Sequence, residues 1–278
     1  MTGATAYDAM FARLTGKDER AFVPFTVLGD PDPGTSLEIV RTLAESGADA
    51  LELGIPFSDP VADGPAIQAA DARALGAGTR VADAWRIIET VRADFGEMPI
   101  GLLVYANLVV CRGADAFYPR AAAAGVDSVL VADAPLVESE PLERAAAAAA
   151  VAAVLIAPPN ASDAALRAIG SRSRGYVYVT SRPGVTGAET ARLRSDADTV
   201  IRRLDELSPE APPPLVGFGI GRPAHVRQVV AMGAAGAISG SAIARLIERG
   251  GDRGTMLARI ADFVRAMKKA TLGTVPVI

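Results

Sequence analysis

Ala50-Leu51-Glu52-Leu53-Gly54 is a short, nearly continuous apolar stretch with one acidic residue at its centre. Seven further stretches of similar length and character are spread along the chain, each bounded by Gly, Pro, Asp or Asn. Runs of this kind are typical of parallel strands that are covered on both faces. In chain order, the eight predicted strands are Phe22–Leu28, Ala50–Gly54, Ile100–Tyr105, Ser128–Val131, Ala153–Ile156, Tyr176–Val179, Leu215–Gly219 and Ala237–Ser239.

Amphipathic or alanine-rich segments separate these stretches and predict helices. Eight of them alternate with the strands: Thr35–Ser46, Arg80–Phe95, Gly113–Ala124, Pro141–Ala150, Asp163–Ile169, Thr190–Leu207, Pro223–Met232 and Thr255–Ala270. A short extra helix, Ser241–Glu248, follows the last strand. This alternation predicts a single (β/α)8 TIM-barrel domain over residues 1–278, with its core at about 22–270. An open, doubly wound sheet is the structural alternative.

The composition excludes several classes of protein. The chain has 28 basic and 32 acidic residues, and a net charge of -4 does not suit non-specific binding of nucleic acid. One cysteine, Cys111, and one histidine, His225, exclude a disulfide framework and metal sites built from several cysteines or histidines. The longest uncharged apolar run, Ala145–Ala157, is shorter than the roughly 20 residues that span a bilayer, and Met1–Arg13 has no signal pattern. We therefore expect a cytoplasmic protein that binds neither nucleic acid nor membrane and holds no metal.

Lysine occurs only near the ends of the chain, at Lys17, Lys268 and Lys269. No mid-chain lysine is available to form a Schiff base with a carbonyl substrate or with pyridoxal phosphate. The chemistry is therefore expected to use carboxylates, hydroxyls, backbone groups and arginine.

Glu52 is the first candidate catalytic residue. Side chains alternate along a strand, so Leu51 and Leu53 should face the helices while Glu52 points into the barrel near its catalytic mouth. Burial there would raise the pKa of the carboxyl group, which suits a general acid–base. The alternative is a structural glutamate that is paired with an arginine.

The loop that follows, Ile55–Pro65, contains three prolines and two acidic residues, Asp59 and Asp63. Prolines lower the entropy that is lost when a loop is ordered, so this loop is suited to deliver a carboxylate to a ligand. Asp63 could accept a hydrogen bond from a ligand N–H while it stays ionised. Its alternative role is a plain N-cap for a helix over Gly64–Leu75.

Glycine-rich segments follow the last three strands, at Gly184–Gly187, Gly217–Gly221 and Gly240-Ser241. Ser241 opens the short extra helix, whose N-terminus favours an anion. The loops after strands seven and eight form the usual phosphate site of this fold. Tight-turn glycines are the alternative interpretation.

Other side chains are assigned by their place in the chain. Phe25, Leu103, Tyr105 and Tyr178 lie in predicted strands, and some of them should line an apolar slot for a flat ring. His225 is expected to be a surface or capping histidine, and Cys111 an inert apolar residue.

Taken together, these segments closely resemble the tryptophan synthase alpha subunit family. The similarity runs in order from about Phe22 to Lys269. The stretches that carry it are Leu51–Pro65 (LELGIPFSDPVADGP), Leu102–Asn107 (LLVYAN), Asp127–Asp133 (DSVLVAD), Gly184–Glu189 (GVTGAE), Gly217–Ile220 (GFGI) and Gly236–Ile243 (GAISGSAI).

The resemblance implies a lyase that cleaves indole-3-glycerol phosphate to indole and glyceraldehyde 3-phosphate for tryptophan biosynthesis. It implies that Glu52 is the main acid–base catalyst and that Asp63 holds the indole N–H. The remaining implied site residues are Phe25, Leu103 and Tyr178 against the indole, Gly187, Gly219, Gly240 and Ser241 on the phosphate, and Asp59, Asn107, Asp133 and Pro135 facing a β subunit. That partner would complete an α2β2 heterotetramer and hold the pyridoxal phosphate, with no cofactor in this chain.

Two residues depart from the family pattern. Ala66 stands where a small polar residue, often threonine, is expected beside Asp63. Pro183 restricts the segment Thr180–Glu189, which should close over the substrate. Neither departure touches the proposed catalysts.

Three other functions compete with a lyase that passes indole to a β subunit. An autonomous lyase would release free indole from the same site. A degenerate chain would only activate the β subunit, although Glu52 and Asp63 are intact. A phosphosugar isomerase could use the same fold, but the lysine, metal and histidine groups common in such enzymes are absent.

Overall fold

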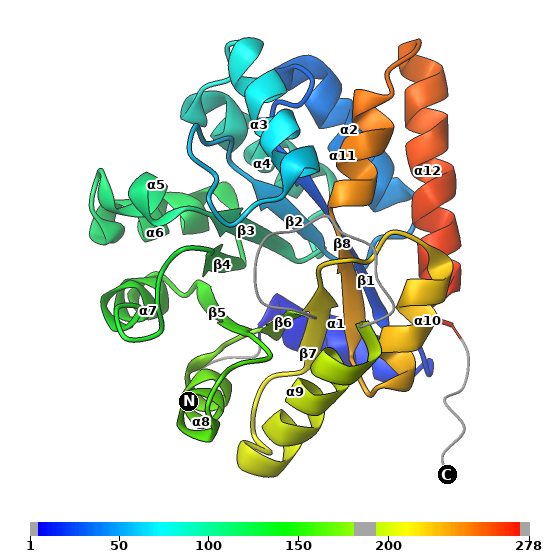
Figure 1. The fold of residues 1–278 in the computed structure, drawn as a ribbon. Coiled ribbons are helices and arrows are strands. Elements are labelled where there is room, and N and C mark those ends of the chain that lie inside the picture. Colours follow the sequence, from blue (N-terminus) through cyan, green and yellow to red (C-terminus); the bar gives the residue numbers. More distant parts are fainter. Residues whose placement is uncertain (1–4, 181–192, 273–278) are drawn as a thin grey trace.

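Each predicted strand is present, and hydrogen bonds between the last strand and the first close the sheet into a barrel (Figure 1). The computed structural model describes residues 5–180 and 193–272. All strand pairs of the barrel are parallel, in the order β1 to β8. The strands are β1 Ala21–Val27, β2 Leu51–Gly54, β3 Ile100–Val104, β4 Ser128–Val131, β5 Ala152–Ala157, β6 Val177–Thr180, β7 Pro214–Gly217 and β8 Gly236–Ser239. Closure confirms the TIM barrel and excludes the open sheet.

Helices surround the barrel, and those predicted from the sequence are found with ends shifted by a few residues. Two described helices were not predicted: α1 before the first strand and the short α5 after β3. The helices are α1 Ala6–Thr15, α2 Pro33–Glu45, α3 Pro65–Gly76, α4 Val81–Asp94, α5 Ala106–Val110, α6 Ala114–Ala124, α7 Glu140–Ala148, α8 Asp163–Arg172, α9 Leu193–Leu207, α10 Pro223–Ala231, α11 Ser241–Glu248 and α12 Arg253–Lys269.

Polar side chains define where several helices begin. Asp32, Ser162 and Asp252 accept backbone N–H groups in the first turns of α2, α8 and α12. Each cap satisfies donors that the first turn of a helix leaves without a partner. The strand-to-helix connections at these points are therefore set by local sequence.

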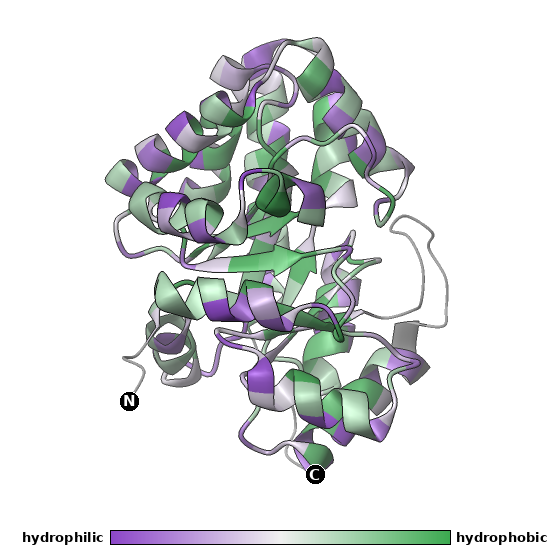
Figure 2. Cartoon of the chain, turned by 90° about the vertical axis from the view of Figure 1, so that its left-hand side faces the viewer, coloured by the Kyte–Doolittle hydropathy of each residue, from purple (hydrophilic) through white to green (hydrophobic). Residues whose placement is uncertain are grey.

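The apolar side chains form two layers because strand residues alternate between the two faces of the sheet. The outer layer packs strand residues such as Leu51 and Leu53 against helix residues such as Ile39 and Ile88. The inner layer fills the barrel with residues such as Val23, Leu130 and Leu215. Figure 2 shows the same division, with apolar strands inside and helices that carry hydrophilic residues. At the mouth of the barrel, the inner face also carries polar residues, which are described below.

Helix α1 contributes to the inner layer from the N-terminal end of the barrel. The Tyr7 hydroxyl is hydrogen-bonded to that of Ser128, the first residue of β4, at 2.9 Å. The Tyr7 ring also contacts Tyr176, with ring centroids 5.3 Å apart. Lys268 lies near the same end, where its Nζ contacts Asp49 at 2.9 Å. The opposite end, where the strands terminate, is thus the open one.

Within residues 5–180 and 193–272, the structure contains no helix long and apolar enough to cross a membrane.

Candidate active site

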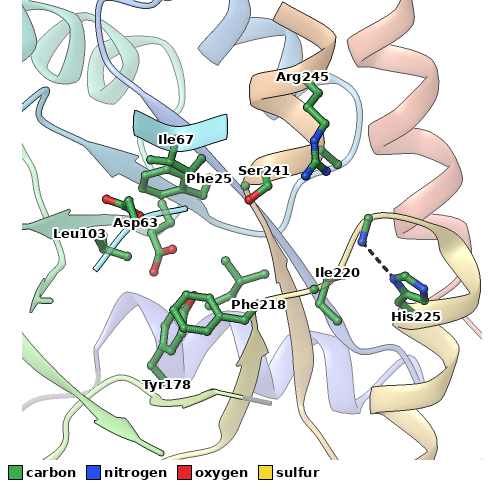
Figure 3. Close-up of a pocket in the computed structure, with 16 residues that line it drawn as sticks. Phe25, Asp63, Ile67, Leu103, Tyr178, Phe218, Ile220, His225, Ser241 and Arg245 are labelled. Carbon is green, nitrogen blue, oxygen red and sulfur yellow. Dashed lines mark hydrogen bonds between the residues drawn. The ribbon is translucent and has the colours of Figure 1, made fainter. Parts of the chain in front are cut away.

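A pocket opens at the C-terminal ends of the strands, with about 670 Å³ of empty space (Figure 3). The structure brings eight of the predicted site residues together around it: Phe25, Glu52, Asp63, Leu103, Tyr178, Gly219, Gly240 and Ser241. Gly187 and the expected closing segment after β6, with Pro183, lie outside the described residues. One carboxylate wall, one apolar wall and one glycine-rich wall therefore meet in a single cavity.

Glu52 points into the barrel as predicted, with its side chain fully buried. Its Oε1 accepts a 2.7 Å hydrogen bond from the Tyr176 hydroxyl, and its buried Oε2 has no partner within the described residues. Burial raises the pKa of Glu52 to about 7, against the opposing effect of the Tyr176 hydrogen bond. The observed partner is a tyrosine, so the interpretation of Glu52 as half of an arginine pair is wrong. The group is suited to exchange protons near neutral pH.

Asp63 lies on the loop before α3, and the structure rejects its alternative role as a helix cap. The N-cap of α3 is Gly64, and the helix has no side-chain capping bond. Oδ2 of Asp63 instead accepts a 2.7 Å hydrogen bond from the Tyr105 hydroxyl. Burial raises the pKa of Asp63, while the Tyr105 hydrogen bond acts in the opposite direction. Ala66, two residues into α3, is half-buried near this wall and offers no polar side chain.

The apolar wall is made by Phe25, Leu103 and Tyr178 together with Ile67 (Figure 3). Phe25 fits between two glycines at strand ends. A Cβ at Gly54 would lie 2.9 Å from the Phe25 ring, and one at Gly240 would lie 2.7 Å from it. Glycine at these positions therefore makes room for a ring at the barrel mouth, which gives these glycines a role besides that of approaching an anion.

The glycine-rich wall lies at the ends of β7 and β8. Gly219 has a φ of +74°, a conformation that favours glycine, and Gly240 and Ser241 stand at the start of α11. The first turn of a helix leaves backbone N–H groups without partners inside the helix, and the first turn of α11 lines the pocket at Ser241 and Ala242. The structure thus brings together Gly219, Gly240 and Ser241, three of the residues predicted to contact a phosphate.

Two cationic or titratable side chains at this end were not placed in the pocket by the sequence analysis. Arg245 lines the pocket from α11 and lies on the same face as Ser241, one helical turn away (Figure 3). The four-residue spacing between Ser241 and Arg245 in the sequence could have predicted that Arg245 lies on the same helix face as Ser241. His225 is also part of the lining, and it is buried. Of the two predicted roles, a surface or a capping histidine, the surface role is therefore wrong. The Nδ1 of His225 accepts a hydrogen bond from the Gly221 N–H at 3.3 Å, which fixes the loop after β7.

The four residues predicted to face a partner lie outside the pocket. Asp59, Asn107, Asp133 and Pro135 are all exposed, on the segments that follow β2, β3 and β4. Asp133 accepts a 2.6 Å hydrogen bond from the Ala106 N–H, which joins two of these segments. They form a rim on one side of the barrel mouth.

Three exposed valines lie on the same rim, after the same three strands. Their exposed fractions are 70% for Val61, 54% for Val110 and 85% for Val137. Cys111, next to Val110, is exposed as well. Cys111 was predicted to be an inert apolar residue, and its exposure shows that it is not packed in the core. Apolar side chains gathered at one edge are typical of an interaction surface.

The fold and the pocket define a class: a (β/α)8-barrel enzyme with buried carboxyl groups and a glycine-rich wall in one pocket. The comparison with known families is more specific. The family model of the tryptophan synthase alpha chain matches residues 11–272, and the chain belongs to this family.

Relatives and solved structures agree with this assignment. A tryptophan synthase alpha chain from Cronobacter sakazakii is 53% identical over 267 residues, which cover 96% of this chain and 98% of the relative. One from Shewanella baltica is 50% identical over 272 residues, 98% of each chain. A structure of Mycobacterium tuberculosis tryptophan synthase superimposes with a TM-score of 0.87 at 29% identity, covering 98% of this chain and 100% of the other. A structure of the Pyrococcus furiosus tryptophan synthase α2β2 complex superimposes with a TM-score of 0.81 at 32% sequence identity. The match covers 90% of this chain and 98% of the other.

Proposed function

We propose that this chain cleaves indole-3-glycerol phosphate to indole and glyceraldehyde 3-phosphate, with Glu52 and Asp63 as its acid–base pair. The observation that carries the proposal is the state of Glu52. It is a buried carboxyl group with a pKa raised to about 7, one oxygen held by Tyr176 and the other without a partner in the described chain. The partnerless oxygen is available to a substrate in the pocket.

The reaction is a retro-aldol cleavage, and its proton transfers can be assigned to these groups. Protonated Glu52 delivers its proton to indole C3, which places positive charge on the ring nitrogen. Ionised Asp63 accepts the ring N–H and stabilises that charge. The bond from C3 to the side chain then breaks, its electrons restore the indole ring, and the side-chain hydroxyl loses a proton to become the aldehyde. Glu52, now ionised, is placed to take that proton.

The same pocket offers a place for each end of the substrate. The indole ring would lie against Phe25, Leu103 and Tyr178, between the two carboxyl groups. The phosphate would be held at Gly219, Gly240 and Ser241 by backbone N–H groups, with Gly187 completing the set. The apolar and carboxylate walls would thus receive the indole, and the glycine-rich wall would receive the phosphate dianion.

No cofactor is needed in this chain for that chemistry. The three lysines do not line the described pocket, and Lys268 is engaged with Asp49 and Glu19 near the other end of the barrel. Pyridoxal phosphate belongs to the β partner in this proposal. We place the assembly in the cytoplasm.

The rim with its three exposed valines is proposed to receive the β subunit in an α2β2 assembly. It includes Asp59 and Val61 of the segment that carries Asp63, so binding there would favour one arrangement of that segment. By linkage, the partner raises cleavage only as far as it prefers the competent arrangement. The Pyrococcus furiosus structure is described as an α2β2 complex with mutual activation, which supports a β partner that activates cleavage.

The test is indole release from indole-3-glycerol phosphate by the isolated chain, with and without a β subunit. We expect weak activity alone and an increase of at least ~10-fold with β, equivalent to roughly 1.4 kcal/mol of barrier. Equal rates with and without β would favour the autonomous lyase. No cleavage in either sample would leave the chain as an activator of β and refute the proposed function.

A further inference from the structure

The carboxyl group of Asp71 is buried as well, but it contacts the loop between β2 and α3 and does not line the pocket. It belongs to α3, and 5% of its surface is exposed. Its Oδ1 accepts a 3.1 Å hydrogen bond from the backbone N–H of Phe57, across 14 residues of chain. The contact ties the start of the loop to a helix that packs against the barrel.

The end of the same loop is held by Tyr105, which follows β3. Its hydroxyl accepts the N–H of Ala62 at 3.1 Å and donates to Asp63 at 2.7 Å. The Phe57 ring stacks on the Tyr105 ring, with centroids 5.2 Å apart and an angle of 23°. Tyr105 therefore contacts both anchored ends of the loop, Phe57 through its ring and Ala62-Asp63 through its hydroxyl.

Between the two anchors, the loop is exposed and carries part of the rim. Asp59 and Val61 are both exposed there. Asp59 makes local contacts: its carboxylate accepts a hydrogen bond from the hydroxyl of Ser58, and its backbone carbonyl accepts the N–H of Val61 at 2.9 Å. A partner would thus bind the exposed middle of a segment whose ends are fixed at Asp71 and Tyr105.

The charges around Asp71 define how it can act. Burial raises its pKa to about 7, the Phe57 N–H opposes that rise, and the carboxylates of Asp63 and Asp30 add to it. Asp30 is itself held by Arg73 through two hydrogen bonds of 2.8 Å. Asp71 therefore has a backbone donor and two acidic neighbours, and the cation closest in sequence is engaged with Asp30.

We propose that Asp71 is a positioning residue for the cleavage reaction: it holds the start of the β2–α3 loop so that Tyr105 can present Asp63 to the substrate, and it does so as a hydrogen-bond acceptor. The inference rests on the proposed function. It also gives a route from the rim to Asp63, because the partner and Asp71 act on the same short segment.

The test compares two substitutions at one position. Asp71→Ala removes the acceptor, whereas Asp71→Asn keeps an acceptor oxygen and removes only the carboxylate. We expect Asp71→Ala to lower kcat of the isolated chain by at least ~10-fold, since small misplacement of a catalytic group has effects of this size. Asp71→Asn should recover most of that loss, and added β subunit should activate Asp71→Ala by a larger factor than the native chain.

A matched control separates positioning from general damage. Asp127 accepts the Ile100 N–H at 2.8 Å at the other end of the barrel, just before β4. Asp127→Ala should lower the midpoint of thermal unfolding and leave kcat unchanged. Hydrogen exchange gives a readout without substrate: peptides covering residues 55–64 should exchange faster in Asp71→Ala than in Asp71→Asn.

The possible results distinguish the proposed lyase function from the positioning role of Asp71. If the native chain releases no indole, the proposed function fails, and exchange alone still tests the anchoring. If the native chain is active and Asp71→Ala matches it in kcat and exchange, the positioning role is overturned. If Asp71→Asn is as impaired as Asp71→Ala, the acceptor account is also overturned.

Discussion

The Tyr176 hydroxyl donates a 2.7 Å hydrogen bond to Oε1 of Glu52, on the opposite side of the barrel interior. This bond holds one oxygen of the carboxyl group, and the other remains for the substrate. It also favours the ionised form, which partly opposes the effect of burial. The pKa of Glu52 therefore results from two opposing effects that can be separated by mutation.

Tyr176→Phe should move the pH dependence of cleavage. Loss of the hydrogen bond leaves burial without its opposing effect, so the pKa of Glu52 should rise. Protonated Glu52 delivers the proton to indole, so the alkaline limb of kcat/KM should shift to higher pH. The measurement is the pH profile of kcat/KM for the native chain and the variant. A limb that stays in place or moves to lower pH would contradict this account of Glu52.

The same pKa makes Glu52 a destabilising group at high pH. In the unfolded chain it ionises near its ordinary value of 4.5, and in the folded protein near 7. Between these values the folded state holds the extra proton, so stability falls as pH rises through this range. Glu52→Gln removes the effect, and its gain in unfolding free energy over the native chain should be greater at pH 8 than at pH 5, by up to about 3 kcal/mol. Urea denaturation at both pH values measures it; an equal gain at both would show that the group is not buried as an acid.

Arg245→Gln should weaken substrate binding more than it slows chemistry. The guanidinium lies near Ser241, at the end of the pocket proposed for the phosphate and away from Asp63 (Figure 3). We expect a rise in KM of a few-fold, about the effect of ~1 kcal/mol, with little change in kcat. Arg249→Gln, at the far end of the same helix, is the control. A fall in kcat with unchanged KM for Arg245→Gln would place the residue in the chemical step instead.

The single cysteine reports directly on the proposed partner surface. Cys111 is exposed beside Val110 on the rim. Binding of a β subunit should slow its labelling by a thiol reagent by at least ~10-fold, because the rim becomes buried. Asp59→Ala should weaken that protection and the activation of cleavage, with the basal rate of the isolated chain nearly unchanged. If a β subunit activates cleavage but does not slow the labelling of Cys111, the β subunit does not bind at this rim.

Much of the fold could be predicted because its signals are local. A run such as Ala50–Gly54 is short, apolar and bounded by glycine, and eight of these runs specify a barrel. The barrel in turn places strand ends together, which is why Glu52, Asp63 and Ser241 meet in one pocket. Helix α1 was missed, although Tyr7, Met10 and Leu14 are spaced for one buried helix face.

The contacts that tune the site could not be predicted in the same way. Tyr176 and Glu52 are 124 residues apart, and Tyr105 and Asp63 are 42 apart. Which hydroxyl reaches which carboxylate depends on strand register and on the direction of each side chain. The surface role of His225 was wrong for a related reason. Its position early in a helix indicated a surface or capping residue, but α10 packs that turn against the loop after β7, where the Nδ1 of His225 accepts the Gly221 N–H.

Indole release by Glu52→Gln, at saturating indole-3-glycerol phosphate and with the β subunit present, tests the central claim most directly. The substitution preserves the shape of the side chain and an oxygen to accept the Tyr176 hydrogen bond, and it removes the proton that is transferred. We predict that kcat falls by at least ~100-fold, the usual effect of losing general acid–base catalysis, while substrate binding is retained. A variant that cleaves at a rate near that of the native chain would contradict the assignment of Glu52.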